Sequence, residues 1–377
     1  MIKEIKLPDL GEGIDSAEVS EIKVSKGDSI KSDDTIIVLE SDKASMEIPS
    51  DYSGVVSKVY VKSGDNISPN DHIIDIVHAS NWVHQSNNDP SFLDIPSSLK
   101  DALENWVTNF EKIKKLDEVL SGYDVLSASV DEYQVATLET KVKLLSPVPT
   151  PQSFRDFYAF EQHVRSARKL RGLDMHPDWF KIPIFYFSNP VALYGHKAEI
   201  PYPTGTNELD FELEFAIIIA NGGSNISVNN AKNFIAGYTI CNDWSARDLQ
   251  REEMAMNLGP AKGKDFATSF GPYMVTPDEL ENDWDENGKL HLRMTCHVND
   301  KLVSDGNTND LYHSFNKMIE RASMNTELLP GDYLGSGTVG TGCILELRPE
   351  NTGGWIKKGD VVKMEVERLG ILENKIV

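Results

Sequence analysis

The sequence predicts a multidomain, mainly β protein, in which a small N-terminal β-sandwich precedes a larger strand-rich domain with flanking helices. Three observations carry this prediction. A strand–turn–strand segment occurs twice within residues 1–78, and residues 209–219 alternate between apolar and acidic side chains before becoming wholly apolar. A stripe of apolar residues at helical spacing lies between these two regions. The chain has 377 residues, which is enough for two or three domains with cores of their own.

The N-terminal repeat predicts the sandwich. Segment 22–37 recurs as segment 59–74. The matched positions include Val24 and Val61, Gly27 and Gly64, Asp28 and Asp65, Ile30 and Ile67, and Asp34 and Asp71. Each copy has the pattern of a strand, a Gly-Asp turn and a second strand. Two copies of one all-β unit imply a sandwich with internal two-fold symmetry. Lys43 falls in a short polar break between the copies, where we expect an exposed hairpin tip.

Residues 1–78 resemble the lipoyl/biotinyl domain family. The opening run Leu7-Pro-Asp-Leu-Gly-Glu-Gly is similar to the lipoyl domains of 2-oxoacid dehydrogenase acyltransferases. In that family the lysine between Asp and Ala carries lipoate in amide linkage, and Asp42-Lys43-Ala44 fits this pattern, whereas biotin carriers usually have Met on both sides. The resemblance therefore implies lipoate on Lys43, with a lipoate ligase or a 2-oxoacid dehydrogenase component as a partner.

The composition excludes several classes of partner. The formal net charge of -22 argues against nucleic acid and against anionic membranes, because both require basic patches. We find no apolar run of membrane-spanning length and no signal-peptide core at the N-terminus, so we predict a cytoplasmic protein. Cys241, Cys296 and Cys343 are far apart in apolar runs, which indicates buried free thiols in a reducing compartment.

The middle of the chain contains a linker and a helix. Residues 79–94 are rich in Asn, Ser and Asp, which is typical of a linker. A helix is predicted from Pro96, with Asp94 as its cap. Its apolar stripe consists of Leu99, Leu103, Trp106, Phe110 and Ile113. Residues 122–145 have the pattern of strands, so we divide the chain into domain 1–78, linker 79–94, lead-in 95–145 and domain 146–377.

Glu212 and Glu214 are the most informative pair in the larger domain. They alternate with apolar residues in segment 209–219, which predicts a strand with both carboxylates on one face. The following apolar run places this strand at the mouth of a core, where two ionised carboxylates need a counter-charge. A divalent cation with oxygen ligands would supply it. The alternative is a strand edge with solvated acids on its wet face.

Four other segments carry chemical groups. If residues 156–163 are helical, Asp156 and His163 share a face as metal ligand and general base, or as a surface acid and a partly buried histidine. Asp243 ends an apolar strand, and segment 259–268 is a glycine-bearing loop with two lysines. Segment 335–346 is rich in glycine, which permits close backbone approach to a ligand, and ends at Glu346. It lacks the Gly-Lys-Ser/Thr of a Walker A loop.

In this order, the segments resemble the fumarylacetoacetate hydrolase family across residues 146–377, which implies a mixed β-roll that is usually dimeric. The resemblance implies that the carboxylate ligands of Mg²⁺, or of Ca²⁺ or Mn²⁺, are Asp156, Glu212, Glu214 and Asp243. It implies that His163 activates water, that Glu346 orients His163, that Lys264 stabilises enolate charge, and that Thr268 lies in the matching stretch of that loop. The matching substrate-contact positions are Tyr158, Arg171, Gln250 and Thr338.

The resemblance implies a hydrolase that cleaves a carbon–carbon bond in a β-diketo acid, with the cation acting as a Lewis acid. Fumarylacetoacetase itself has a tyrosine where this chain has Met254, and segment 251–257 is one residue longer, so we expect a different acylpyruvate-like substrate. One alternative is oxaloacetate decarboxylation, or 2-oxo acid hydration or isomerisation, at the same site. The other is a lipoyl carrier or docking module of a 2-oxoacid dehydrogenase complex.

Overall fold

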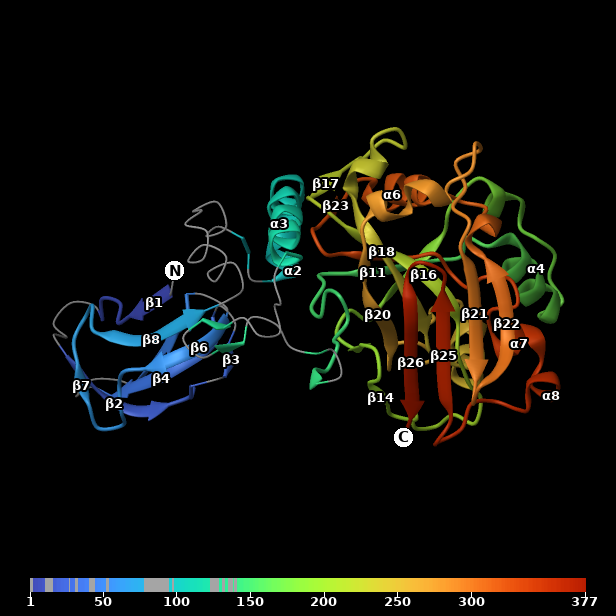
Figure 1. Cartoon of the computed structure of the whole chain (residues 1–377). Coiled ribbons are helices and arrows are strands. Elements are labelled where there is room, and N and C mark those ends of the chain that lie inside the picture. The colour runs from blue at the N-terminus through green and yellow to red at the C-terminus, as the bar shows by residue number, and fades with distance from the viewer. Residues whose placement is uncertain are drawn as a thin grey trace. The chain divides into compact units, whose positions relative to one another are not determined.

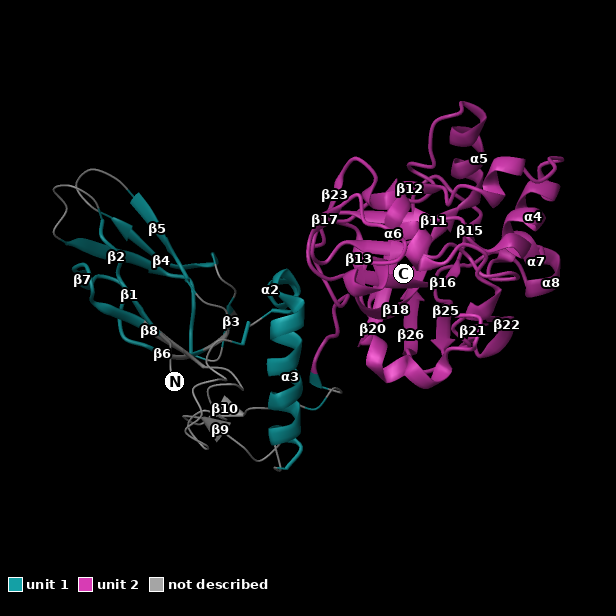
Figure 2. Ribbon diagram, turned by 90° about the horizontal axis from the view of Figure 1, so that it is seen from above, with its two compact units in different colours: residues 1–141 teal, residues 142–377 magenta. Residues whose placement is uncertain are grey.

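The computed structural model describes residues 3–10, 16–26, 28–30, 33–40, 45–51, 54–77, 95–96, 98–122, 129–130, 133–134, 138 and 141–377. The chain divides into two compact units, residues 1–141 and 142–377 (Figure 2). Among the described residues, no helix combines the length and the apolar character that a membrane span requires. The mainly β fold class predicted from the sequence is confirmed.

The N-terminal unit contains a sandwich of two four-stranded sheets, with strand orders β1-β8-β6-β3 and β5-β4-β2-β7 (Figure 1). The strands are β1 (Lys3–Lys6), β2 (Ala17–Ile22), β3 (Ser29–Ile30), β4 (Thr35–Glu40), β5 (Ser45–Pro49), β6 (Gly54–Val59), β7 (Asn66–Ile67) and β8 (His72–Val77). Their inward side chains, among them Val19, Ile37, Val56 and Ile73, form one apolar cluster. The predicted two-fold symmetry is present, because β2, β3 and β4 correspond to β6, β7 and β8 in both order and pairing.

The repeated Gly-Asp turns have the same hydrogen bond in both copies. Asp28 Oδ2 accepts from Ser25 N and Asp65 Oδ2 accepts from Lys62 N, each at 2.7 Å. The strand after each turn then joins the opposite sheet, since β3 pairs with β6 and β7 pairs with β2. The turns therefore link the two sheets, and this exchange gives the sandwich its symmetry.

Lys43 lies outside the described residues. The two strands that flank it are described: β4 ends at Glu40 and β5 begins at Ser45, and these two residues pair across antiparallel strands. An exposed position for Lys43 at a hairpin tip stays a prediction.

The predicted helix is present but begins later than expected and is divided. Helix α2 (Leu99–Glu104) is capped by the Ser98 side chain, which accepts from Asp101 N at 3.1 Å, so Asp94 as the cap was wrong. At Asn105 the backbone leaves the helical conformation, and α3 (Trp106–Leu120) follows. Leu103 and Trp106 of the apolar stripe are buried. Of the strand-rich lead-in, the structure describes the short pair β9 (Ser129–Val130) and β10 (Tyr133–Gln134). The four-part division of the chain stays a prediction.

The C-terminal unit is built on a seven-stranded mixed sheet of order β12-β11-β24-β16-β18-β20-β13 and a five-stranded sheet of order β14-β26-β25-β21-β22 (Figure 1). The first sheet comprises β11 (Phe154–Phe157), β12 (Phe185–Ser188), β13 (Leu193–Tyr194), β16 (Leu213–Ile219), β18 (Ile235–Asp243), β20 (Thr268–Val275) and β24 (Tyr333–Gly335). The second comprises β14 (Glu199–Ile200), β21 (Arg293–Val298), β22 (Lys301–Asn307), β25 (Val361–Val366) and β26 (Gly370–Ile376). Side chains of both sheets share one core.

This unit also contains two further strand pairs, five α-helices and four short 3₁₀ helices. The strand pairs are β15 (Leu209–Asp210) with β19 (Ser245–Ala246), and β17 (Gly223–Ser224) with β23 (Glu327–Leu328). The helices are α4 (Glu161–Leu170), α5 (Arg247–Ala255), α6 (Phe315–Ser323), α7 (Ile344–Leu347) and α8 (Pro349–Thr352). Helices α4 and α7 lie next to each other in both views (Figures 1 and 2).

The register of the larger sheet brings distant acids together. Asp156 on β11 pairs with Gly335, which in turn pairs with Ala216 on β16. On the other side of β16, Glu214 pairs with a residue of β18, two positions before that strand ends at Asp243. The carboxyl groups of three strands therefore meet in one region of the sheet.

The predicted continuous strand over residues 209–219 is broken. Residues 209–210 form β15, which pairs with β19, and β16 begins only at Leu213. At the break, backbone N–H groups bond to side chains instead of a neighbouring strand: Phe211 N donates to Asp210 Oδ1 at 2.8 Å, and Glu212 N donates to Asn242 Oδ1 at 3.0 Å. Side-chain acceptors thus satisfy the backbone where the ladder stops.

The proposed helical face shared by Asp156 and His163 was wrong. Asp156 lies on strand β11, which pairs with β12 and β24, and only His163 is helical, on α4. The two side chains therefore belong to different elements, and the sheet register determines where Asp156 lies.

Candidate metal and catalytic site

Three carboxylates converge in the C-terminal unit. One oxygen from each of Asp156, Glu212 and Glu214 lies within 4.8 Å of the others. The exposed fractions of these residues are 3%, 6% and 0%. The alternative of solvated acids on a wet strand face is therefore excluded, and the cluster lies in the buried interior of the sheet.

The cluster suits a hard divalent cation. Asp156 Oδ1 and Glu214 Oε2 are buried and have no hydrogen-bond partner within the part of the chain that the structure describes. Burial and the neighbouring carboxylates raise the pKa of Asp156 and of Glu214 well above their ordinary values. Buried oxygens without donors are costly unless another group compensates them, and an all-oxygen donor set is the one that Mg²⁺, Mn²⁺ and Ca²⁺ prefer.

Glu212 has two cationic partners. Lys264 Nζ donates to Glu212 Oε2, and Arg247 Nη2 lies 2.8 Å from Glu212 Oε1. Burial by itself would raise the pKa of Glu212, but the charges of Lys264 and Arg247 hold that pKa below its usual range. Glu212 therefore stays ionised while Asp156 and Glu214 tend to hold protons.

Asp243 lies beside the cluster and is linked to it by Lys264. Lys264 Nζ donates to Asp243 Oδ2 at 2.6 Å, the Tyr186 hydroxyl donates to the same oxygen, and Thr268 Oγ1 lies 3.4 Å from Asp243 Oδ1. Burial and the Glu212 charge raise the pKa of Asp243 despite the attraction of Lys264. The fourth predicted ligand is thus adjacent to the other three, with the lysine ammonium between Asp243 and Glu212.

His163 and Glu346 form a buried pair. His163 Nδ1 and Glu346 Oε2 are 3.0 Å apart, although the residues are separated by most of the domain in sequence. Burial opposes the ionised form of Glu346, but the hydrogen bond from His163 lowers the pKa of Glu346 below its ordinary value. An ionised carboxylate only accepts, so Nδ1 carries the proton and a neutral imidazole has a free lone pair on Nε2. The Cys343 thiol lies beside this pair.

The predicted substrate-contact residues surround these groups. Tyr158 packs edge-on against the His163 ring, and burial raises the pKa of Tyr158 to about 12. Arg171 follows α4 and its charge acts on Tyr158. The other two are Gln250, which accepts from Arg247 Nη1 at 3.1 Å, and Thr338, which donates to Glu214 Oε1 at 3.3 Å.

The glycines of segment 335–346 allow close approach to strand β11. A Cβ on Gly335 would lie 2.3 Å from Asp156 Oδ1, and a Cβ on Gly337, where φ is +77°, would lie 2.3 Å from the Phe157 carbonyl oxygen. These glycines therefore allow segment 335–346 to approach β11, the strand that carries Asp156.

Sequence reasoning missed three residues of this site: Asp210, Tyr186 and Arg247. Asp210 and Arg247 form a fully buried ion pair, with Nε to Oδ2 at 2.8 Å. Asp210 belongs to the same alternation as Glu212, which was a usable signal. Arg247 lies between Asp243 and Gln250, two residues that the sequence did single out, so its segment was also a usable signal. Tyr186 stands in a segment without a distinctive pattern, so only the fold reveals it. The expectation of free cysteines is met, since Cys241, Cys296 and Cys343 are buried and unbridged.

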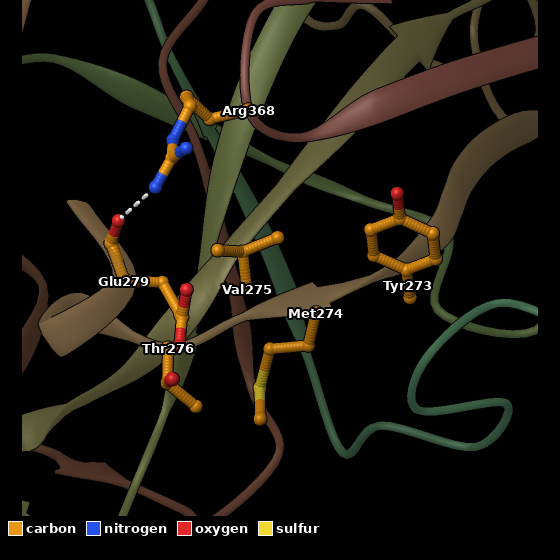
Figure 3. Close-up of a pocket in the computed structure, with 6 residues that line it drawn as sticks. All are labelled: Tyr273, Met274, Val275, Thr276, Glu279 and Arg368. Carbon is orange, nitrogen blue, oxygen red and sulfur yellow. Dashed lines mark hydrogen bonds between the residues drawn. The ribbon is translucent and has the colours of Figure 1, made fainter.

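A separate surface pocket lies elsewhere in this unit (Figure 3). It has a volume of about 360 Å³ and is lined by Tyr273, Met274, Val275, Thr276, Glu279 and Arg368. Val275 and Thr268 are at opposite ends of β20, roughly 23 Å apart at the rise of an extended strand. The Arg368 guanidinium is already engaged, because Nη2 donates to the Glu279 carbonyl at 2.7 Å. This pocket is therefore distinct from the carboxylate cluster.

Comparison with known proteins places these features in a family. The family model "Fumarylacetoacetate (FAA) hydrolase C-terminal" matches residues 152–377, and the model "Biotin-requiring enzyme" matches residues 3–76. Fumarylacetoacetase of Arabidopsis thaliana is 29% identical over 257 residues, which cover 55% of this chain and 61% of that protein. The mitochondrial oxaloacetate tautomerase FAHD2A of Homo sapiens is 30% identical over 197 residues, which cover 52% and 60%. The chain thus spans about three fifths of the length of these curated relatives.

Two solved structures have a similar fold. The 5-carboxymethyl-2-hydroxymuconate delta-isomerase from Mycobacterium smegmatis matches with a TM-score of 0.50 and 28% identity, covering 64% of this chain and 82% of that one. Fumarylpyruvate hydrolase from Pseudomonas aeruginosa, in complex with Mn²⁺ and pyruvate, matches with a TM-score of 0.50 and 21% identity, covering 65% and 99%. At the latter identity the likeness concerns the fold. Because the hydrolase model covers more than half of the residues, the chain belongs to the fumarylacetoacetate hydrolase family and has a biotin/lipoyl-type domain at its N-terminus.

Proposed function

We propose that the chain is a divalent-metal-dependent hydrolase that cleaves a carbon–carbon bond in an acylpyruvate-like β-diketo acid. The observation that carries this proposal is the buried His163–Glu346 pair, with its 3.0 Å contact, whose imidazole acts electrostatically on Glu212 of the carboxylate cluster. A site with an oriented imidazole can activate water, and a carboxylate cluster can hold the cation that polarises a diketo acid.

The residues that would hold the cation are Asp156, Glu212, Glu214 and Asp243. Their donor set fits Mg²⁺, or Mn²⁺ or Ca²⁺, because every ligand atom is oxygen and two of these oxygens lack partners among the described residues. When bound, the cation would withdraw electron density from the two adjacent oxygens of the substrate.

The His163–Glu346 pair determines which proton transfers we propose for this site. His163 Nε2 takes a proton from water while Glu346 holds the opposite ring nitrogen, and the water oxygen bonds to the distal carbonyl carbon. The carbon–carbon bond then breaks, and its electron pair passes to the 2-oxo acid fragment as an enolate. We propose that the Lys264 ammonium stabilises this negative charge and that His163 returns its proton to the enolate carbon. The products are a carboxylic acid and a 2-oxo acid.

Tyr158, Arg171, Gln250 and Thr338 are proposed to contact the substrate. Arg171, which is exposed at the end of α4 and whose charge acts on Tyr158, would supply the positive charge that a substrate carboxylate needs. Met254 is 39% exposed near the end of α5, the helix that also carries Gln250. This apolar side chain supports a substrate other than fumarylacetoacetate.

A second candidate is keto–enol isomerisation of a 2-oxo diacid. It is favoured by relatives of about 30% identity, because one is named an oxaloacetate tautomerase and a 28% identical structure is named an isomerase. The same imidazole would move a proton between carbon and oxygen without adding water, so no carbon–carbon bond would break.

The test is a screen of metal-stripped protein, resupplied with Mg²⁺ or Mn²⁺, against acylpyruvates, fumarylpyruvate and oxaloacetate. Pyruvate is measured with lactate dehydrogenase, enol loss by ultraviolet absorbance, and carbon dioxide as the sign of decarboxylation. We expect pyruvate from an acylpyruvate, its loss with EDTA, and its loss in H163Q. Enol loss without pyruvate would support the isomerase, and full pyruvate release in EDTA would overturn the metal-dependent mechanism.

We also propose that Lys43 carries lipoate, because the N-terminal domain belongs to the biotin/lipoyl type. Intact-mass measurement of protein from its own host should reveal a lipoyl adduct that is lost in K43R. A biotin adduct would reassign the cofactor, and an unmodified mass would reject the proposal.

A lipoate ligase, a 2-oxoacid dehydrogenase component and a homodimer remain predicted partners. Ile184, Phe187 and Val191 are exposed apolar residues in or beside β12, an edge strand of the larger sheet, and we propose this edge for the dimer contact.

A further inference from the structure

Asp210 is a fully buried carboxylate on which three segments of the C-terminal unit converge. Its two oxygens accept hydrogen bonds from Phe211 N at 2.8 Å, from Arg247 Nε at 2.8 Å, and from Ile344 N and Leu345 N at 2.8 and 2.9 Å. The donors come from the strand break at residue 211, from the start of α5 and from the start of α7. One side chain thus joins elements that are more than a hundred residues apart.

The contact with α7 replaces a missing helix cap. Cys343 is the residue before α7, and its side chain makes no capping hydrogen bond. The first N–H groups of a helix need acceptors, and Asp210 supplies them to Ile344 and Leu345. The next residue, Glu346, is the one that contacts His163 Nδ1. The direction of the Glu346 side chain therefore depends on a cap provided by Asp210.

The contact with Arg247 leads to the carboxylate cluster. The Arg247 guanidinium bonds to Asp210 through Nε, lies 2.8 Å from Glu212 through Nη2, and donates to Gln250 through Nη1 at 3.1 Å. Because a guanidinium is planar and rigid, the bond at Nε restricts where the other two nitrogens can lie. Asp210 therefore acts on both halves of the site, although it contacts neither the cluster nor the imidazole in the contacts described above.

We propose that Asp210 is a positioning residue, which holds Glu346 against His163 through α7 and holds Arg247 against Glu212. This inference rests on the proposed hydrolytic function. An asparagine at this position would keep the shape of the side chain, but its NH₂ group would face donors, so at least one of α7 and Arg247 would lose its acceptor. The structural consequence is a Glu346 that no longer maintains the correct orientation of the imidazole.

The experiment compares D210N, E346Q and the D210N/E346Q double variant in the full-length chain, with acylpyruvate turnover and Mn²⁺ affinity as readouts. We expect D210N to lower kcat by at least about tenfold, with KM and the Mn²⁺ dissociation constant changing less than about threefold. In the E346Q background the same change should cost less than in the wild type, because only the effect through Arg247 on Glu212 remains to be lost. Equal, additive losses in both backgrounds would overturn the proposal.

Asp332 provides a matched control. It is also buried, accepts from Ser153 N and Leu329 N at 2.8 and 2.9 Å, and pairs with Arg155. None of these contacts involves a proposed site residue, so D332N should show the stability cost of a buried Asp-to-Asn change without the specific loss of kcat. If D332N and D210N affected turnover equally, Asp210 would be a structural residue only.

A second variant and a spectroscopic readout cover two other outcomes. If D210N does not fold, I344P removes one N–H that donates to Asp210 Oδ1 while leaving the buried charges intact. Ile344 is the first residue of α7, where proline is tolerated, and the preceding Cys343 is already extended, so the same loss of kcat is expected from the lost contact. If the wild type cleaves no substrate, the proposed function fails. Asp210 is then tested by the imidazole N–H proton signal of His163, assigned with H163Q. That signal should shift in D210N and not in D332N, and an unchanged signal in D210N would reject the positioning role.

Discussion

Gly335 and Asp156 pair directly across the parallel strands β11 and β24, and a Cβ on Gly335 would lie 2.3 Å from Asp156 Oδ1. That oxygen is one of the two in the carboxylate cluster without a hydrogen-bond partner among the described residues. The absence of a side chain on Gly335 therefore leaves room for Asp156 Oδ1, an oxygen that is available to the proposed cation.

The G335A variant should displace this carboxylate. Because real Cβ atoms do not approach an oxygen this closely, either Asp156 rotates or β24 shifts, and overpacking of this kind costs about 1–3 kcal/mol. We expect the Mn²⁺ affinity measured by calorimetry to fall at least about tenfold, which corresponds to about 1.4 kcal/mol. G222A is the control, since its nearest atom would be 3.3 Å from the new Cβ. Equal affinities in the two variants would contradict the crowding argument.

Removal of Glu214 should abolish stabilisation by the cation. In the wild type, a ligand at about one hundred times its dissociation constant adds about 2.7 kcal/mol to the free energy of unfolding. This increase raises Tm by roughly 5–10 °C for a domain of this size. E214Q removes a ligand and also a carboxyl whose pKa is raised by burial and by Asp156. We therefore expect metal-free E214Q to melt no earlier than the metal-free wild type, while added Mn²⁺ leaves its Tm unchanged. A full Mn²⁺-induced rise in E214Q would place the cation elsewhere.

Cation binding should strengthen as the pH rises. The pKa values of Asp156 and Glu214 are raised in the folded protein, so the metal-free fold binds more protons than the unfolded chain, and its stability falls as pH rises from their ordinary values towards the raised ones. A cation must displace these protons. Calorimetry in two buffers of different ionisation enthalpy should detect proton release that decreases in E214Q. Binding that does not change as the pH rises above the ordinary pKa values of these carboxyls would contradict the protonated cluster.

The sequence predicted those features that depend on residues close together in the chain. The two-residue spacing of Glu212 and Glu214 predicted that they share a face, and the apolar run after them predicted the burial of that strand. The Gly-Asp repeat likewise predicted the symmetric sandwich, because both turns use an Asp to bind the backbone three residues earlier. Both patterns involve residues a few positions apart, so the sequence alone is enough to recognise them.

The remaining features depend on contacts between distant residues. A four-residue strand such as β11 has too few positions for a period, which is why Asp156 was assigned to a helix. The partner of Asp210 is Arg247, 37 residues later, and the cap of α7 comes from a residue 134 positions earlier. No local pattern encodes such pairs, because the sheet register decides which buried charges meet.

Lys264 and Lys262 offer a matched test of the buried charges, since both lie in the same loop and both form ion pairs with acids. The Lys264 side chain is 4% exposed and bonds to Glu212 and Asp243, whereas that of Lys262 is 73% exposed and bonds to Asp265. Removing one partner of a buried pair costs about 3–5 kcal/mol because a charge is left uncompensated, while an exposed pair contributes about 0–1 kcal/mol. K264M should therefore lower the midpoint of metal-free thermal unfolding strongly, and K262M should leave it nearly unchanged. Added Mn²⁺ should recover part of the loss in K264M, because the cation supplies positive charge to the same carboxylates. Equal midpoints for the two variants would show that Lys264 does not neutralise the cluster.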